Sequence, residues 1–515
     1  MTRKMIMMLR FLCLFLLLLA LIKVFHKLWW TPIRIQKLMS LRGIKGPPYR
    51  LLYGNGKEII NMQKEAALMP RNLSHDIFPR LHPHIHSWSK RYGKNFLMWY
   101  GVQPVLVVTE PESCKEIFNN KDGAFPKPKP SDIVKKLFGD SLAMTEDEKW
   151  ANLRKLANHA FHGESLKAMF PDMTASAEAM IERWKNHEGK ETDVFEEFRL
   201  LTSEVIARTA FGSSYLEGQN IFEMLKNLSI IVFKNLYKYK TRFPGISKVY
   251  RTSGEIEADK LEKEIQDSVM EIVKKREQKA SSGEGESFGS DFLGLLLKSH
   301  HDINDDQKFS IDNVVEECKA LYFVGQETTS TLLSWTVFLL AQHPEWQEEA
   351  RKEVLQLFGK ETPNSDGISK LKTMSMIINE TLRLYPPVNL IGRIVPREVK
   401  LGAVQVPANV ELLIPTVALH HDSQIWGQEA ALFKPERFSE GVAKATNDNM
   451  GSFSPFGMGP RMCAGINFAS NEAKIALSMI LQHYSFTLSP AYVHSPFQFL
   501  TVRPQHGVQV ILHSL

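Results

Sequence analysis

The residues with the clearest chemical potential lie in the segment 456–465, which reads Phe-Gly-Met-Gly-Pro-Arg-Met-Cys-Ala-Gly. Cys463 stands at the entry to a helical pattern, where the positive end of the helix dipole favours the thiolate, the form that binds metals. Gly459 and Gly465 permit a close approach of the backbone to a flat ligand, and Arg461 can pair with an anionic group on that ligand. The competing interpretation is a buried structural cysteine beside a glycine-rich turn.

An acid and a hydroxyl follow each other in a second segment, residues 324–329, which reads Val-Gly-Gln-Glu-Thr-Thr. Glu327 and Thr328 can carry protons beside a pocket. A threonine hydroxyl can also bond back to a helix carbonyl and loosen the helix locally. Taken alone, the segment is equally compatible with an ordinary polar step within a helix.

The element that must position this acid and hydroxyl is the longest predicted helix, residues 310–342. Ser310 is a suitable N-cap, and the dipeptide His343-Pro344 ends the helical pattern. At about 1.5 Å per residue the helix is roughly 45–50 Å long, enough to cross a whole domain. Its centre, residues 320–340, is apolar or small on all faces, so we expect it to be buried.

A modest sheet is predicted from two further blocks, residues 97–109 and 399–414, which contain β-branched residues and turn signals. Helical periodicity dominates the middle of the chain, and we find no internal repeat. We therefore expect a mainly α fold with a small β region, arranged as one large catalytic domain over residues 51–515.

The charge of the chain is unevenly distributed. The 515 residues include 63 Lys and Arg and 57 Asp and Glu, a net charge of +6. Residues 1–50 hold ten of the basic side chains and no acidic one, so the rest of the chain has 53 basic and 57 acidic residues, a net charge of −4. This balance argues against a nucleic-acid partner. Four cysteines are too few for a disulfide scaffold in a chain of this length.

The basic N-terminus surrounds an apolar run. Residues 5–25 provide the roughly 20 apolar positions that a membrane-spanning helix needs, and no small-residue cleavage site follows them. Basic residues and the pair Trp29 and Trp30 lie on the C-terminal side of this run, which predicts a retained anchor with the body in the cytosol. Residues 26–50 are expected to form a basic linker that ends in a Pro-rich hinge.

The cysteine segment fits the pattern Phe-x-x-Gly-x-Arg-x-Cys-x-Gly and closely resembles the haem-binding loop of the cytochrome P450 family. The resemblance implies that Cys463 is the axial ligand of the iron of haem b. It also places Phe456 and the other fixed positions of the loop, Gly459, Arg461 and Gly465, around the cofactor. Met458 and Ala464 stand where bulkier residues are common in the family.

The long-helix segment is similar to the oxygen-activating motif of the same family, in which Glu327 and Thr328 would handle protons. Val324 departs from the family, which usually has Ala or Gly there, and its side chain would crowd the substrate pocket. The resemblance draws the rest of that pocket from Val388 and its neighbours and from segments near 121–145, 211–250 and 496–501.

Further motifs occur in family order. The Glu380-x-x-Arg383 pair and Arg437 of a Pro-Glu-Arg-Phe segment resemble a buried charge cluster that serves as a structural clamp. The resemblance also implies that Trp150, Arg154 and Arg393 donate hydrogen bonds to the haem propionates, carboxylates that suit the arginine fork.

The resemblance implies a monooxygenase that inserts one atom of O₂ into a hydrophobic small molecule, such as a terpenoid, gibberellin or steroid-like skeleton or a foreign compound. Electrons would come from NADPH through a cytochrome P450 reductase, at the endoplasmic reticulum membrane. Residues 453–474 and 161–167 look like the plant clan that includes secologanin synthase. The alternatives are a haem-thiolate isomerase or dehydratase acting on hydroperoxides, and a membrane-anchored haem-binding protein without turnover.

Histidines and the remaining cysteines were considered as further metal ligands. His82, His84 and His86 alternate around a proline, and His420 and His421 are adjacent, so neither group has the spacing of a helical zinc site. We expect surface or capping roles for them. The other three cysteines, Cys13, Cys114 and Cys318, are expected to pack as small hydrophobic residues.

Overall fold

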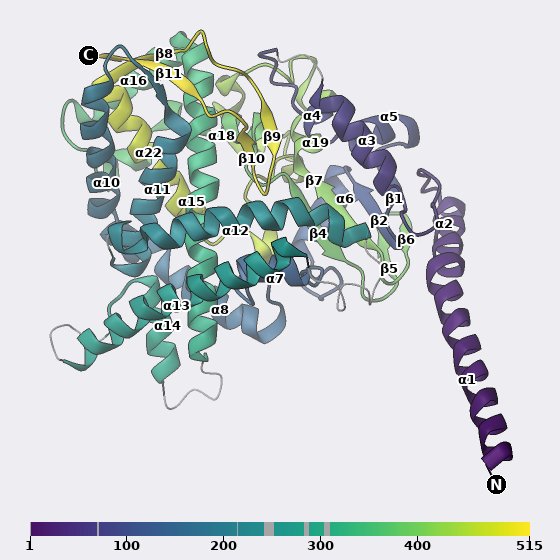
Figure 1. The fold of residues 1–515 in the computed structure, drawn as a ribbon. Coiled ribbons are helices and arrows are strands. Elements are labelled where there is room, and N and C mark those ends of the chain that lie inside the picture. The colour runs from purple at the N-terminus through teal and green to yellow at the C-terminus, as the bar shows by residue number, and fades with distance from the viewer. Residues whose placement is uncertain (1, 69–71, 214, 242–251, 283–287, 303–308) are drawn as a thin grey trace.

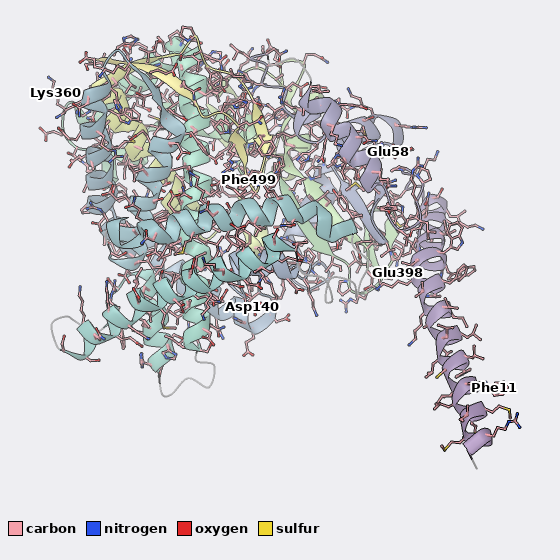
Figure 2. The ribbon with its side chains drawn as sticks, in the orientation of Figure 1. Phe11, Glu58, Asp140, Lys360, Glu398 and Phe499 are labelled. Atoms are coloured by element: carbon pink, nitrogen blue, oxygen red, sulfur yellow. The ribbon has the colours of Figure 1, made fainter. Side chains whose placement is uncertain are left out.

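The N-terminal helix stands apart from the rest of the molecule. The computed structural model describes residues 2–68, 72–213, 215–241, 252–282, 288–302 and 309–515. Helix α1 (Thr2–Phe25) projects from the body (Figure 1), and its Phe11 side chain, labelled in Figure 2, is 67% exposed. Within the described part of the chain, the helical stretch Met5–Leu41 is the one that is long and apolar enough to cross a membrane. The predicted N-terminal apolar helix is therefore present.

A few side chains of the segment predicted as a linker, residues 26–50, pack against the folded body, although most of the segment is exposed. The helix continues through a π-helical turn (His26–Trp30) into α2 (Thr31–Leu41), and a turn at Gly43 follows. Met39, Ile44 and Tyr49 are buried in a hydrophobic cluster with the sheet. The folded body thus begins before residue 51, because apolar side chains in the basic segment find buried partners.

The long helix lies at the centre of the body. Helix α15 (Ile311–Gln342) begins and ends where the sequence predicts, with the Ser310 side chain accepting the Asn313 amide. Helix α11 (Val194–Phe211) packs along it. The two helices come so close at Gly325 that a Cβ atom there would lie 2.8 Å from the Ile206 side chain. A larger residue at this position would require the Ile206 side chain to shift.

The other helices surround this pair (Figure 1). They are α3 (Gly56–Ala67), α4 (Phe78–Leu81), α5 (Pro83–Tyr92), α6 (Pro111–Asn119), α7 (Asp132–Phe138), α8 (Asp147–Ala160), α9 (Gly163–Ala168), α10 (Phe170–Trp184), α12 (Tyr215–Thr241), α13 (Ser253–Ser281), α14 (Phe292–His301), α16 (Pro344–Phe358), α17 (Ser365–Lys370), α18 (Lys372–Leu384), α19 (Thr416–His420), α20 (Ser423–Trp426), α21 (Val442–Ala445) and α22 (Ile466–His483).

The strands form small sheets. The largest has the order β1-β2-β7-β4, in which β2 and β7 are parallel and the other neighbours antiparallel, and it lies on the side of the anchor (Figure 1). Three further sheets pair β5 with β6, β9 with β10, and β11 with both β3 and β8. The bounds are β1 (Asn95–Tyr100), β2 (Gln103–Val108), β3 (Glu191–Asp193), β4 (Leu390–Ile394), β5 (Val399–Leu401), β6 (Val404–Val406), β7 (Glu411–Pro415), β8 (Tyr484–Leu488), β9 (Pro496–Gln498), β10 (Val502–Pro504) and β11 (Gln509–Ser514).

Both predicted blocks contain strands: β1 and β2 cover the first, and β5, β6 and β7 cover the second. The mainly α fold with a small β region is confirmed. Part of the predicted pocket segment 211–250 lies outside the described residues.

Candidate active site

Cys463 lies between a short 3₁₀ turn (Gly459–Arg461) and the start of α22. Its amide donates a hydrogen bond to the Phe456 carbonyl, 2.9 Å between nitrogen and oxygen, which closes the loop. The side chain is exposed, yet the surrounding protein desolvates the sulfur. This combination is expected of a side chain that faces an internal space rather than the outer surface of the molecule.

The predicted effect of the helix entry is present but is outweighed by burial. Burial raises the pKa of the Cys463 thiol above its ordinary value, and the opposing effects of the Gly465 amide and the Arg154 charge are smaller. The helix terminus is a local effect, whereas desolvation depends on all surrounding atoms. A bound metal ion deprotonates a coordinating thiol outright, so the sulfur remains suited to hold one.

Glycine is required at one position of the loop. Gly459 has φ +67°, and a Cβ atom there would lie 2.3 Å from the carbonyl oxygen of Phe118, at the end of α6. Gly465 has a different surrounding, since the nearest atom to its added Cβ is the Cys463 sulfur at 4.0 Å. The loop therefore packs tightly against α6 on one side and stays open beside the sulfur.

Three of the predicted propionate ligands gather next to the loop. The Arg461 guanidinium stacks over the Trp150 ring at 3.8 Å, pairs with Glu146 and donates to the Thr145 carbonyl over 2.9 Å. Arg154 of α8 donates to the carbonyl of Met462, one residue before the cysteine.

The fourth predicted ligand, Arg393 of β4, has a side chain that is 7% exposed, and burial lowers its pKa. Its charge acts on Arg461 and on a further cation, Lys127, which the sequence interpretation missed. Burial, followed by the charges of Arg461 and Arg393, lowers the pKa of Lys127 to about 8. Its amide donates to Glu146 over 2.9 Å.

The chemistry of these donors fits haem. The cluster contains four cations: Lys127, Arg154, Arg393 and Arg461. The carboxylates whose charges act on them are Glu146 and Asp147, so the cluster has an excess of two positive charges. Propionate carboxylates match that excess. Lys127 belongs to no short sequence motif. It joins the cluster only through the folded course of the loop before α7, so the sequence does not indicate its place.

The long-helix residues lie in a continuous helix, so the local loosening predicted at this segment is not observed. The Thr328 hydroxyl donates to the Val324 carbonyl over 2.9 Å. From α11, the Thr202 hydroxyl donates to the Gln326 carbonyl over 3.0 Å. The helix thus keeps its regular form while its carbonyls accept additional hydroxyl groups.

Glu327 is 3% exposed and faces the C-terminal hairpin. It accepts a hydrogen bond from the Thr501 hydroxyl over 2.7 Å, and the Arg503 guanidinium lies 3.7 Å from the same carboxylate oxygen. Thr501 is the last residue of the segment 496–501 that the sequence predicts to line the pocket, whereas Arg503 lies beyond that segment. Of the predicted pocket residues, Val324 is half-buried on α15, and Val388 is 42% exposed just before β4.

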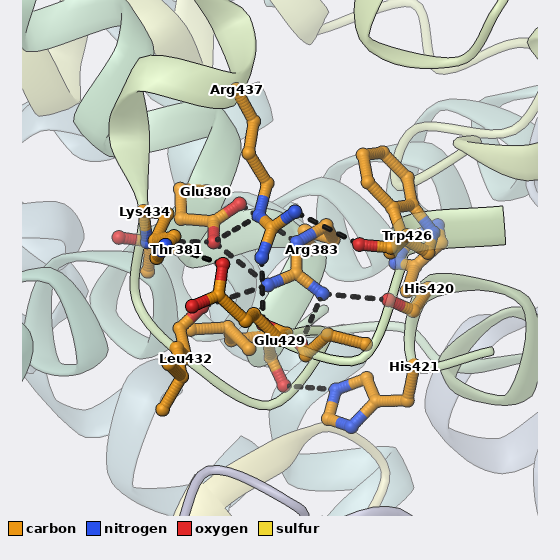
Figure 3. A network of polar contacts seen from close by, with 12 residues as sticks. Glu380, Thr381, Arg383, His420, His421, Trp426, Glu429, Leu432, Lys434 and Arg437 are labelled. Carbon is orange, nitrogen blue, oxygen red and sulfur yellow. Dashed lines mark hydrogen bonds and ion pairs between the residues drawn. The ribbon is translucent and has the colours of Figure 1, made fainter. Parts of the chain in front are cut away.

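The predicted clamp residues meet in one buried network (Figure 3). Glu380 accepts two hydrogen bonds of 2.7 Å from Arg383, and Arg437 lies 3.5 Å from it. Arg383 also donates to the carbonyls of His420 and Ala430 over 2.8 and 2.7 Å. This arrangement ties α18 to the segment that precedes the cysteine loop.

The histidines differ from expectation. His82, His84 and His420 are nearly fully buried, and burial lowers their pKa values to about 4, 3 and 3. The surface role predicted for these three is wrong, whereas His82 does occupy a cap position, between the end of α4 and the start of α5, without a hydrogen bond from its side chain to the helix ends. The His420 ring accepts the Ser454 amide over 3.2 Å and so helps to hold the cysteine loop.

Within the described part of the chain, none of these histidines belongs to a group that could hold a metal ion. Among the described residues, that arrangement occurs at the ends of α13 and α14, in Glu277, His300 and His301. Cys114 and Cys318 are buried as predicted, and burial raises the pKa of each thiol.

Comparison with known proteins gives one consistent result. The cytochrome P450 family pattern matches residues 73–512. A protein from Panax ginseng, cytochrome P450 CYP749A22, is 58% identical over 506 residues, which cover 98% of this chain and 96% of the relative. Cytochrome P450 72A68 from Medicago truncatula is 42% identical, over 96% of this chain and 95% of the relative. The 11-oxo-beta-amyrin 30-oxidase of Glycyrrhiza uralensis is 43% identical, over 95% of this chain and 94% of the relative.

Proposed function

Since this chain belongs to the cytochrome P450 family, whose members are haem-thiolate monooxygenases, we propose that it oxidises a polycyclic terpenoid or a similarly hydrophobic molecule with electrons from NADPH. The electrons would arrive through a cytochrome P450 reductase. The observation that supports this most directly is the loop around Cys463, in which a desolvated but accessible sulfur lies beside a cluster with excess positive charge.

The substrate class is inferred from a relative and from apolar side chains. A protein 43% identical to this chain carries a name that specifies oxidation of a beta-amyrin skeleton. In this chain, Phe233 of α12 packs against Phe497 and Phe499, with ring centroids 5.4 and 4.9 Å apart. These rings lie in segments expected to form the substrate pocket. Aromatic and aliphatic surfaces favour a ligand with little polar surface.

Each site residue then has a proposed task. Bound haem supplies the activation of O₂ for oxygen insertion. Cys463 would hold the iron, with the loop positions Phe456, Gly459 and Gly465 around it.

Four residues would hold the propionates, with Lys127 beside them: Trp150, Arg154, Arg393 and Arg461. The Thr328 hydroxyl and the Glu327 carboxyl group would hold and move protons.

The location follows from the projecting apolar helix. One N-terminal apolar helix fits a membrane anchor on this domain. The basic residues that follow the apolar run favour a body in the cytosol. We propose the endoplasmic reticulum membrane from the likeness of this chain to membrane-bound members of the family. The enzyme would then meet a hydrophobic substrate and the membrane-bound reductase at the same lipid surface.

The test is production of the full-length chain in microsomes with reductase and NADPH, and a screen of terpenoids for oxidised products. Incorporation of ¹⁸O from labelled O₂ identifies a monooxygenase. Product formation without NADPH would instead indicate an isomerase or dehydratase. Absence of turnover with every terpenoid would contradict the proposed substrate class.

The assignment of Cys463 as the iron ligand is tested with Cys463→Ala. This variant should lose the absorption band that reduced haem-thiolate proteins show with carbon monoxide. Cys13→Ala is the matched control, because Cys13 lies exposed on α1 and its loss should leave the spectrum unchanged. Retention of the spectrum by Cys463→Ala would overturn the assignment.

A further inference from the structure

The turn between β9 and β10 reaches the acid of the long helix. Thr501 in this turn donates its hydroxyl hydrogen to the Oε1 atom of Glu327 over 2.7 Å, and both side chains are 3% exposed. A buried carboxylate needs such partners, since its desolvation is otherwise unfavourable. The two residues are 174 positions apart in the chain, so the contact depends on the docking of the hairpin.

The position of this turn does not depend on the Thr501 hydroxyl. The next residue, Val502, donates its amide to the Pro387 carbonyl over 2.9 Å and accepts the indole N–H of Trp335 over 2.6 Å. Trp335 lies on α15, two turns beyond Glu327. The backbone bonds therefore hold the turn against the same helix that carries the acid.

Arg503 is the second partner of Glu327, and its guanidinium contacts residues other than Glu327 as well. Its guanidinium lies 3.6 Å from the centre of the Phe499 ring and 3.7 Å from the Glu327 carboxylate. The charges of Arg199 and Glu196 on α11 also act on it. Arginine has donors only, so it can bind the carboxylate form of Glu327 but offers no acceptor to a protonated acid.

A hydroxyl group behaves differently, because it both donates and accepts. The Thr501 hydroxyl can donate to the carboxylate and, after rotation about its C–O bond, accept from the carboxylic acid. The bond between the two side chains can therefore persist whether Glu327 carries a proton or not. Valine has the same shape and can do neither.

We propose that Thr501 is a positioning residue that holds the Glu327 carboxyl group in place while it takes up and releases a proton. This inference rests on the proposed function, since it assigns Thr501 a task in the proton delivery of a monooxygenase. Thr501 acts through Glu327 rather than on the substrate. Phe499 and Arg503 lie next to the pair formed by Thr501 and Glu327.

The first test needs no turnover. The full chain is unfolded in urea as wild type, Thr501→Val, Glu327→Leu and the double variant, because leucine, unlike glutamine, offers no acceptor to the Thr501 hydroxyl. We expect a lower midpoint for Thr501→Val, and a smaller additional effect of Thr501→Val once Glu327→Leu is present. Additive shifts would overturn the contact, whatever the outcome of the substrate screen.

The second test measures coupling with the terpenoid identified by that screen. Thr501→Val should lower the product formed per NADPH consumed about tenfold, the effect of one lost hydrogen bond to a charged group, and raise hydrogen peroxide correspondingly. Thr501→Ser should restore most of the coupling. The apparent KM should change little, because the hydroxyl binds Glu327.

The matched control is Thr336→Val. Thr336 is buried on α15, and its hydroxyl donates to the Leu332 carbonyl over 2.9 Å. Thr336→Val should lower the stability of the protein somewhat but leave the product formed per NADPH consumed unchanged. Equal coupling in Thr501→Val and Thr336→Val, in a protein that forms product normally, would overturn the positioning role and leave the proposed function intact.

Discussion

Arg383 offers the sharpest test of how the fold is held together. Its side chain is fully buried and makes two hydrogen bonds to Glu380, and it also donates to the carbonyls of His420, Ala430 and Leu432. Methionine has a similar length but no donor. Arg383→Met therefore leaves a buried carboxylate without its main partner and three carbonyls without this donor.

The cost can be worked from these contacts. Breaking a buried ion pair by removing one partner costs about 3–5 kcal/mol. Each buried carbonyl left unpaired adds about 1 kcal/mol or more. The total is about 6–8 kcal/mol, against a typical stability of about 5–15 kcal/mol for a whole protein. Arg383→Met should therefore fold poorly and retain little haem.

A graded series separates charge from hydrogen bonding. Glu380→Gln keeps an acceptor for Arg383 and the Lys434 amide but removes the charge, so we expect an intermediate loss. Glu429→Gln is the control, because Glu429 is 57% exposed and pairs with Lys434 at the rim of the same network. That surface pair should contribute little to stability, because solvent screens it.

The assay is urea unfolding followed by circular dichroism, together with the haem content of purified protein. The expected order of stability is Glu429→Gln, then Glu380→Gln, then Arg383→Met. If Arg383→Met lost less than about 1 kcal/mol, the network would not be the clamp that its burial and bonds indicate.

Two further predictions concern single positions, one of them buried and the other half-buried. Burial raises the pKa of Glu317, whose carboxylate accepts the Leu142 amide over 2.6 Å, from 4.5 to about 8. The folded protein therefore binds this proton more tightly than the unfolded chain, and the free energy of unfolding should fall as the pH rises from about 4.5 to about 8. Glu317→Gln should remove that fall in urea unfolding at a series of pH values. Gly459→Ala should cost about 2–5 kcal/mol, from overpacking against the Phe118 carbonyl and from a positive φ, and should lower haem content.

Matched controls isolate the cause in both cases. Glu349 is 59% exposed and pairs with Lys352, so Glu349→Gln should leave the pH dependence between about 4.5 and 8 unchanged. Gly441 has φ +87° but no atom within 4 Å of an added Cβ, so Gly441→Ala measures the cost of φ alone. Equal losses for the two glycine variants would show that the contact with Phe118 carries no cost.

The features that the sequence predicts well are those with local causes. Ser310 and the His343-Pro344 step mark the ends of α15 because capping and the missing proline amide act within one turn. The β-branched residues and turn signals of β1 and β2 are likewise local. The fixed spacing around Cys463 identifies the loop because its close packing and its ligand both constrain single positions.

The features that escape prediction depend on three-dimensional surroundings. His82 and His84 have polar side chains in a sequence that suggests a surface, yet the packing of α5 buries them. The pKa of Cys463 follows the same rule, since burial outweighs the helix terminus. Lys127 joins the cation cluster through a loop whose course no motif specifies.

Glu327 shows how far this dependence extends into the site. A motif of the long helix marks the acid as a proton carrier, but its bound partners, Thr501 and Arg503, belong to a hairpin near the C-terminus. That hairpin is held by Trp335 of the same helix, so α15 carries both the acid and the anchor for the partners of the acid. A substitution at Trp335 should therefore alter the surroundings of Glu327 without touching it. The functional unit is thus the docked pair of helix and hairpin, and no single segment of the chain contains it.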